Sequence, residues 1–199
     1  MCWSSSFLCP RHRVSPVNEA AANTTRFTAR ALDPVLPGLF LAVVTLLFGL
    51  GLGVVFGLNE DLIKSRLKAS ADAVSTVMYQ DDAAKSKAVL DKSWVYMQRA
   101  HLHAGSLGVV AVGLSLLVVL LGTGPRVART LSVGLGAGGL GYSVYWLLAG
   151  FRAPGLGGTT AAKESLAWLA IPASGAFVAS TATVAVLLLL AMRRPRGNG

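Results

Sequence analysis

The chain has 199 residues, of which 53% are hydrophobic and only 14% are charged, and its mean hydropathy is +0.59. Soluble domains carry roughly 25% charged residues, so this composition excludes an ordinary soluble globular protein and favours a membrane protein. The net charge of +9 does not indicate nucleic acid binding. Most of the basic residues lie outside the apolar segments, where they set orientation and meet anionic lipid headgroups.

Residues 1–33 are rich in Ser, Thr, Asn and Arg and show little periodicity. Such a segment buries too little apolar surface to offset the entropy of ordering it. The sequence therefore predicts a mobile N-terminal tail over residues 1–33, followed by a membrane domain over residues 34–199.

Four windows are long and apolar enough to cross the roughly 30 Å hydrocarbon core of a bilayer as helices. They cover residues 35–58, 103–122, 127–148 and 171–192, and none contains Asp, Glu or Lys. Arg129, at one edge, is their only arginine. The lipid bilayer is thus the expected surroundings, and the predicted fold class is all-α, an integral membrane four-helix bundle.

The segment between the first two spans, residues 59–100, is charged and has two helical patterns. Asn59-Glu60-Asp61 is typical of one helix start, and Asp81-Asp82 of a second. No Pro or Gly interrupts the second pattern before Gly105. We therefore predict an extramembrane helical hairpin whose second arm continues straight into the second span.

Glycines recur on the predicted spans. The first span carries Gly49, Gly53 and Gly57 at intervals of four residues, and the third carries five glycines that include two overlapping G-x-G-x-x-G matches. A dinucleotide-binding fingerprint requires a strand and a soluble βαβ unit, which this segment does not offer. We interpret the glycines as small faces that allow helices to approach closely in lipid.

An antiparallel bundle gathers the end of the first span, the start of the second, the end of the third and the start of the fourth at one membrane face. Polar and aromatic side chains are concentrated there, and such groups at the edge of a membrane are candidates for function. They are Arg99, His101, His103, Tyr142, Tyr145, Trp146, Arg152, Glu164 and Trp168.

His101 and His103 are candidate ligands, because neutral imidazole binds haem iron, copper and zinc well. Residues two apart on an α-helix differ by about 200°, so the two rings point to nearly opposite sides and do not chelate one metal together. Each could ligate a separate centre, or one could be a ligand while the other hydrogen-bonds to Glu164 or a tyrosine.

Ala100-His101-Leu102-His103 resembles the Ala-His-x-His helix of haem–copper oxidase catalytic subunits, in which the two histidines serve different haems. The longer pattern that ends at Leu107-Gly108 is similar to small four-span membrane proteins distantly related to that superfamily. The resemblance implies haem b or copper as cofactor, ligated by His101 or His103, in a pocket lined by Tyr142, Tyr145 and Trp146.

A haem held by two histidines needs an imidazole from a facing helix, and spans one, three and four contain none. His12 in the tail is the only other histidine of the chain. The second axial position would therefore be filled by Met97 or Met78, left open, or supplied as a histidine by a second protomer or another subunit. A non-catalytic alternative exists for the same side chains. His, Tyr and Trp also serve as interfacial anchors and helix-to-helix hydrogen-bonding groups, with Arg99 extending toward the headgroups.

Two functions follow from these readings. The first is a haem- or copper-binding redox module at the outer membrane face. The alternative is a non-catalytic accessory or scaffold subunit, whose partner is a second copy of the chain or another subunit of a membrane complex. No nucleophile elbow, His-Glu-x-x-His or phosphate loop occurs, so an independent enzyme is not expected. A carrier is disfavoured because no ionisable residue lies near a span midplane.

Four crossings place both termini on one side of the membrane. The eighteen Lys and Arg residues divide equally between the two sides, but the bases of residues 59–100 are interleaved with six acids. We therefore expect both termini to be cytoplasmic in a bacterial inner membrane, with the hairpin outside.

Overall fold

The computed structural model describes residues 31–193. The chain divides into two units, residues 1–33 and 34–199, and the tail predicted for the first lies outside the described residues except for residues 31–33. The described part of the second unit is helical and has no strand. Its elements are α2 (Leu36–Asp72), the π-helical η1 (Ser75–Tyr79), α3 (Ala83–Leu120), α4 (Pro125–Arg152), α5 (Thr159–Glu164) and α6 (Ala167–Met192).

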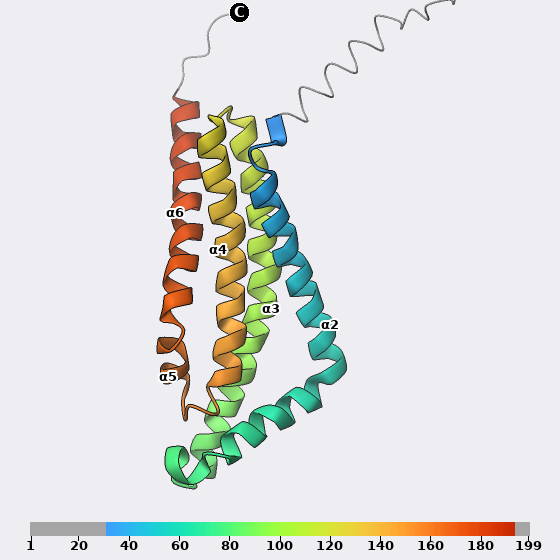
Figure 1. Ribbon diagram of the computed structural model, residues 1–199, viewed down its shortest axis with the longest axis vertical. Helices are drawn as coiled ribbons and strands as arrows, with labels where there is room; N and C mark the ends of the chain where they lie inside the picture. Colours follow the sequence, from blue (N-terminus) through green and yellow to red (C-terminus); the bar gives the residue numbers. More distant parts are fainter. Residues whose placement is uncertain (1–30, 194–199) are drawn as a thin grey trace, which may run out of the picture. The chain divides into compact units, whose positions relative to one another are not determined.

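Four of these helices, α2, α3, α4 and α6, are long and apolar enough to cross a membrane. Each covers one of the predicted spans to within two residues. They run alternately up and down in the second unit, so that consecutive spans are antiparallel (Figure 1). The prediction of an all-α integral membrane bundle with four spans is confirmed.

The outer faces of α2 and α6 carry large apolar side chains with nothing packed over them. Phe40 and Leu47 on α2 and Ile171 and Met192 on α6 are each more than half exposed. Water would disfavour such surfaces, whereas the hydrocarbon core of a bilayer accommodates them. These are the lipid-facing sides of the bundle.

Helix α4 lies at the centre and contacts α2, α3 and α6, whereas α6 packs almost entirely on α4. Glycines make the approach possible. A Cβ added at Gly136 would lie 2.5 Å from the carbonyl oxygen of Gly38, and one at Gly138 would lie 2.7 Å from that of Ala173. Such small-residue faces replace the hydrophobic effect as the basis of helix association in lipid. The glycines of the third span therefore serve helix packing.

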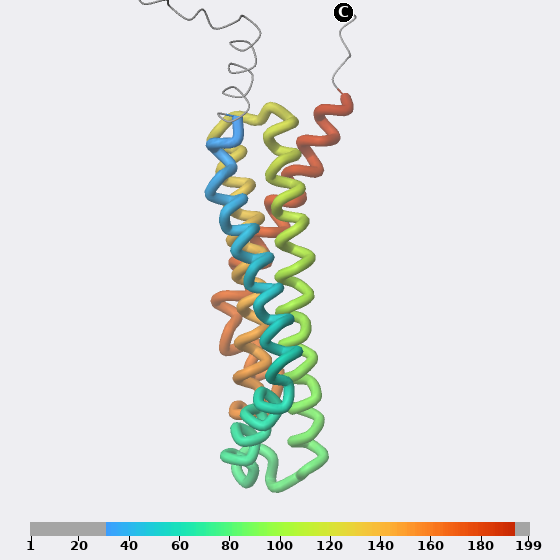
Figure 2. Tube along the Cα trace, turned by 90° about the vertical axis from the view of Figure 1, so that its right-hand side faces the viewer, coloured from blue at the N-terminus to red at the C-terminus, as the bar shows by residue number. Residues whose placement is uncertain are grey.

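The first span ends at a kink. Asn59 has non-helical backbone angles (φ −131°, ψ 26°) within α2, and its side-chain amide donates to the carbonyl oxygen of Val55 at 3.3 Å. That bond engages a carbonyl at the point where regular helix hydrogen bonding is interrupted. Beyond the kink, residues 60–72 turn across the end of the bundle toward the start of α3 (Figures 1 and 2).

The tip of the hairpin is closed by side-chain hydrogen bonds. Asp81, which has a left-handed backbone, accepts from the hydroxyls of Ser75 and Thr76 at 2.9 and 3.2 Å. Asp82 then caps α3 by accepting from the backbone N–H groups of the second and third residues that follow it. The acidic pair therefore starts the second arm as predicted, because an Asp side chain satisfies N–H groups that a helix leaves free. Helix α3 continues unbroken from this cap into the second span.

The two arms pack on each other and on α4. Ile63 and Leu67 of α2 form a buried cluster with Met97 of α3, and Trp94 lies against it. At the tip, the Tyr79 hydroxyl donates to the carbonyl oxygen of Pro154 at 2.7 Å, and both residues are buried. The hairpin is thereby tied to the segment between α4 and α5.

Candidate functional site

The two histidines of α3 point to different neighbours, as their two-residue spacing predicts. His101 lies against α2, whereas His103 lies against α4. The angle between successive helix positions separates them even though both occupy the same turn. They therefore belong to two distinct environments.

The ring of His101 fits into the glycine face of α2. Its Nδ1 donates to the carbonyl oxygen of Gly49 at 2.7 Å, and a Cβ added at Gly53 would lie 2.8 Å from its Cε1. A carbonyl oxygen only accepts, so this bond places the proton on Nδ1 of the neutral imidazole. Because Gly53 has no side chain, the imidazole ring has room to pack against α2. His101 therefore forms a contact between the two helices.

His103 belongs to a cluster of rings that we call the aromatic cluster. Its members come from α3 and α4 and comprise Tyr96, His103, Tyr142, Tyr145 and Trp146. The imidazole centroid lies 5.4 Å from that of Tyr142 and 6.2 Å from that of Trp146, and Trp146 lies 4.8 Å from Tyr96. Pairs at such distances add attraction beyond simple burial.

Arg99 covers the outer end of the aromatic cluster. Its guanidinium carbon lies 5.1 Å from the Trp146 ring centroid and 5.5 Å from that of Tyr96. Sequence reasoning placed Arg99 here but missed Tyr96. The spacing of Tyr96, Arg99 and His103, three and then four residues apart, would have identified a shared helix face.

One fully buried polar atom of this cluster has no hydrogen-bond partner among the described residues. The indole Nε1 of Trp146 is buried, and within residues 31–193 no hydrogen bond reaches it. A buried N–H donor without an acceptor is costly, and such groups usually bind a protein atom, water or a ligand. The ring that carries this N–H is also the ring over which the Arg99 guanidinium lies.

Three of the predicted rim residues do not join the aromatic cluster. Trp168 is 70% exposed, and Glu164 and Arg152 are also exposed. Among the described residues, none of the three makes a hydrogen bond, ion pair or ring contact through its side chain with His101, His103 or the cluster. The topology brings these residues to the same end of the bundle but does not direct their side chains inward.

The methionines considered as axial ligands lie elsewhere. Met97 is fully buried in the cluster with Ile63 and Leu67, and Met78 lies beside Gly157. Between residues 31 and 193, no group of three or more His, Cys, Asp or Glu side chains is arranged to hold a metal ion. His12 lies outside the described residues.

A crevice of about 190 Å³ opens next to the aromatic cluster, toward the membrane interior. Leu107 of α3, Tyr142 of α4, and Ser174, Phe177 and Val178 of α6 line it. Tyr142 belongs to both the crevice and the cluster, so the two are continuous.

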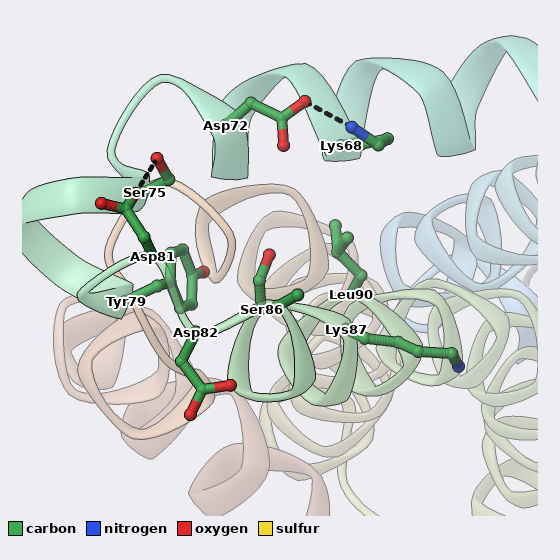
Figure 3. A pocket seen from close by; sticks show the side chains of 10 residues that line it. Lys68, Asp72, Ser75, Tyr79, Asp81, Asp82, Ser86, Lys87 and Leu90 are labelled. Carbon is green, nitrogen blue, oxygen red and sulfur yellow. Dashed lines mark hydrogen bonds and ion pairs between the residues drawn. The ribbon is translucent and has the colours of Figure 1, made fainter.

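A second hollow region lies in the hairpin. Two pockets of about 420 and 410 Å³ share Lys68 and Leu90 and together form a groove between the two arms, which we call the hairpin groove. Figure 3 shows the larger pocket, with Lys68 and Asp72 on the α2 side and Ser86 and Leu90 on the α3 side. The sequence predicted the hairpin but gave no sign of the groove.

The rim of the hairpin groove is charged, and each of its three lysines is paired with a carboxylate. Lys68 bonds to Asp72 at 2.6 Å and Lys87 to Asp91 at 2.7 Å, while Lys64 pairs with Glu60. All of these groups are exposed, so each pair contributes little to stability. Leu67, Leu90 and Trp94 give the groove apolar wall surface beneath this rim.

No family model matches the chain, and comparison with curated proteins and with solved structures finds no significant match. The class of protein rests on the fold, which defines a four-span integral membrane protein with an extramembrane helical hairpin.

Proposed function

We propose that this chain is a non-catalytic accessory subunit of a membrane complex, and that it contacts its partner through the hairpin groove. The observation that carries the proposal is the groove itself, about 420 and 410 Å³ in its two parts and outside the predicted spans. Its apolar walls and charged rim have the composition of a protein interface, in which an apolar centre excludes water and polar groups surround it.

The dimensions of the hairpin groove support a helical partner segment. Its wall on α3 extends at least from Ser86 to Trp94. These nine residues are separated by eight steps of 1.5 Å, which span about 12 Å. Two turns of a helix would cover that length and could place apolar side chains against Leu90 and Trp94. Amphipathic helices bind grooves in this way through residues spaced three and four apart.

The contacts of His101 also support a role without redox chemistry. His101 is engaged by Gly49 and Gly53, so its ring serves helix packing. Membrane helices use such polar contacts together with small residues to fix their association.

Site-specific crosslinking tests this proposal. A photoreactive amino acid at Ser86, inside the hairpin groove, should crosslink in native membranes to one discrete partner. The same group at Lys92, which is exposed on α3 and is not among the residues lining either pocket, should not. Leu90→Lys should abolish both the Ser86 crosslink and recovery of that partner, and an equal yield from both positions would refute the proposal.

Ligation of haem or copper by His103 is the second candidate. Its support is that the imidazole lies among aromatic rings and that, in the part of the chain described, no hydrogen bond engages its ring nitrogens. Purified protein would then show a Soret band or bound copper, lost in His103→Ala and retained in His101→Ala. Absence of both signals from protein purified out of its native membrane would refute this candidate.

The orientation proposed from the charge distribution has its own test. Val77 is 79% exposed at the hairpin tip, so Val77→Cys in a chain that lacks Cys2 and Cys9 provides a single label site. A membrane-impermeant maleimide should label it in intact cells if the hairpin lies outside. Labelling only after the membrane is opened would place the hairpin in the cytoplasm.

A further inference from the structure

Helices α3 and α4 together form the outer part of the aromatic cluster. Arg99, His103 and Leu107 occupy successive turns of one face of α3, four residues apart. They run antiparallel to Trp146 and Tyr142 of α4, as the contacts of Arg99 with Trp146 and of His103 with Tyr142 indicate. This face has a donor-rich end outside and an apolar crevice inside.

The donor-rich end has no acidic partner. Among residues 31–193, the ion pairs join hairpin lysines to carboxylates, and none includes Arg99. The Arg99 guanidinium is exposed above the cluster, and the buried indole N–H of Trp146 beside it lacks an acceptor. Guanidinium groups bind phosphate through parallel charge-assisted hydrogen bonds. The donors at this end therefore lack an anionic hydrogen-bond acceptor.

The inner end is shaped for an apolar chain. The crevice of about 190 Å³ is lined mainly by apolar groups from Leu107, Phe177 and Val178, between α3 and α6. Leu107 is eight residues beyond Arg99, so the crevice lies about 12 Å deeper along the helix. That distance corresponds to the step from a headgroup phosphate to the upper part of an acyl chain.

We propose that this face binds one anionic phospholipid, with its phosphate at Arg99 and His103 and one acyl chain in the crevice beside Leu107 and Phe177. The site lies where the second span begins, which is the level of lipid headgroups. It is separate from the hairpin groove and does not depend on the accessory role proposed above.

Native mass spectrometry of the delipidated protein, titrated with phosphatidylglycerol or with phosphatidylcholine of the same acyl chains, tests the proposal. The wild type should retain one phosphatidylglycerol and prefer it by about tenfold, the effect expected of one charge-assisted contact. Arg99→Gln should remove the preference, and Arg99→Lys should keep part of it. Arg152→Gln is the matched control, because this exposed arginine lies at the same end of the bundle, and it should leave the preference unchanged.

The acyl chain has a separate test. Ser174→Leu adds side-chain volume inside the crevice and should weaken binding of both phospholipids equally, without changing the preference between them. If Arg99→Gln does not fold, a salt titration of the wild type takes the place of that variant. Salt screens an exposed charge contact, so higher ionic strength should reduce the preference for phosphatidylglycerol.

Four results would overturn the proposal. These are equal binding of both phospholipids, an unchanged preference in Arg99→Gln, equal loss in Arg152→Gln, and binding of inorganic phosphate that competes with phosphatidylglycerol.

Discussion

His101 joins α3 to α2 by donating from Nδ1 to the carbonyl oxygen of Gly49 at 2.7 Å. This carbonyl lies one helical turn before Gly53, whose missing side chain accommodates the imidazole ring. The glycine repeat and the paired histidines, two separate features of the sequence, are thus parts of one contact. The contact gives the first histidine a structural role.

The first prediction concerns this hydrogen bond. His101→Phe keeps a ring of similar size but removes the donor, so the bond to Gly49 is lost. Interhelical hydrogen bonds in membranes contribute about 0.6 kcal/mol on average and up to about 1.7 kcal/mol, and we expect a loss of unfolding free energy in that range. Reversible unfolding in mixed detergent micelles measures it. Leu102→Phe, at an exposed neighbouring position, should cost nothing comparable, and equal stability of His101→Phe and wild type would contradict the assignment.

The second prediction compares two glycines of the same repeat. A Cβ at Gly53 would lie 2.8 Å from His101, whereas one at Gly57 would meet nothing within 4 Å. Both Gly→Ala changes alter helix propensity similarly, by up to about 1 kcal/mol in favour of the helix, so their difference isolates the steric effect. Gly53→Ala should be less stable than Gly57→Ala by about 1 kcal/mol or more.

A double-mutant cycle provides the control for that comparison. In a His101→Ala background the ring is absent, so the difference between Gly53→Ala and Gly57→Ala should largely disappear. A difference that persists unchanged would show that another neighbour opposes a side chain at position 53.

The four spans and the hairpin were predictable because their signals are local. An apolar run of about 20 residues, the Asp81-Asp82 helix start and the two-residue spacing of the histidines each act within a few helical turns. The sequence predicted less well which way individual side chains point. Shared topology placed Glu164 and Trp168 at the correct end of the bundle, but their exposure depends on how α5 and α6 are rotated, which no local pattern specifies.

The sequence also did not predict which residue each ring contacts. Nothing in the pattern around His101 selects Gly53, which lies 48 positions earlier in the chain, over the other glycines. Tyr96 lies one turn before Arg99, in the charged arm and outside the apolar windows, so no local pattern assigned it to the cluster. Such contacts depend on helix rotation and on packing at central α4, which are properties of the assembled bundle.

The third prediction concerns the anchor of the hairpin tip. Tyr79→Phe removes the hydroxyl that donates to Pro154 and leaves this carbonyl oxygen with only the longer bond from the Gly157 N–H, at 3.4 Å. Loss of such a hydrogen bond costs about 0.5–1.5 kcal/mol, and the cost should appear as easier opening of the tip. Hydrogen exchange of residues 75–82 should accelerate by up to about tenfold, since about 1.4 kcal/mol corresponds to a factor of ten. Tyr142→Phe, outside the hairpin, is the control and should leave exchange of the tip unchanged. Unchanged exchange in Tyr79→Phe as well would show that the bond to Pro154 does not form.

The fourth prediction is the pH dependence of the same anchor. Burial raises the pKa of the Tyr79 phenol above its usual value near 10. The folded state thus favours the protonated hydroxyl. Its contribution to stability is complete below pH about 10 and is lost as pH rises through the higher pKa of the folded state. Opening of the hairpin tip should therefore increase only in strongly alkaline solution.

A difference titration measures that pKa directly. The ultraviolet absorbance of tyrosinate in the wild type, minus that in Tyr79→Phe, reports the single phenol against the background of the other tyrosines. In folded protein the difference should appear above pH 10, and in denaturant it should appear at the ordinary value, because the unfolded phenol is hydrated. A folded-state difference that titrates at or below the ordinary value would mean that the hydroxyl is exposed to water, and the anchor to Pro154 would then not form.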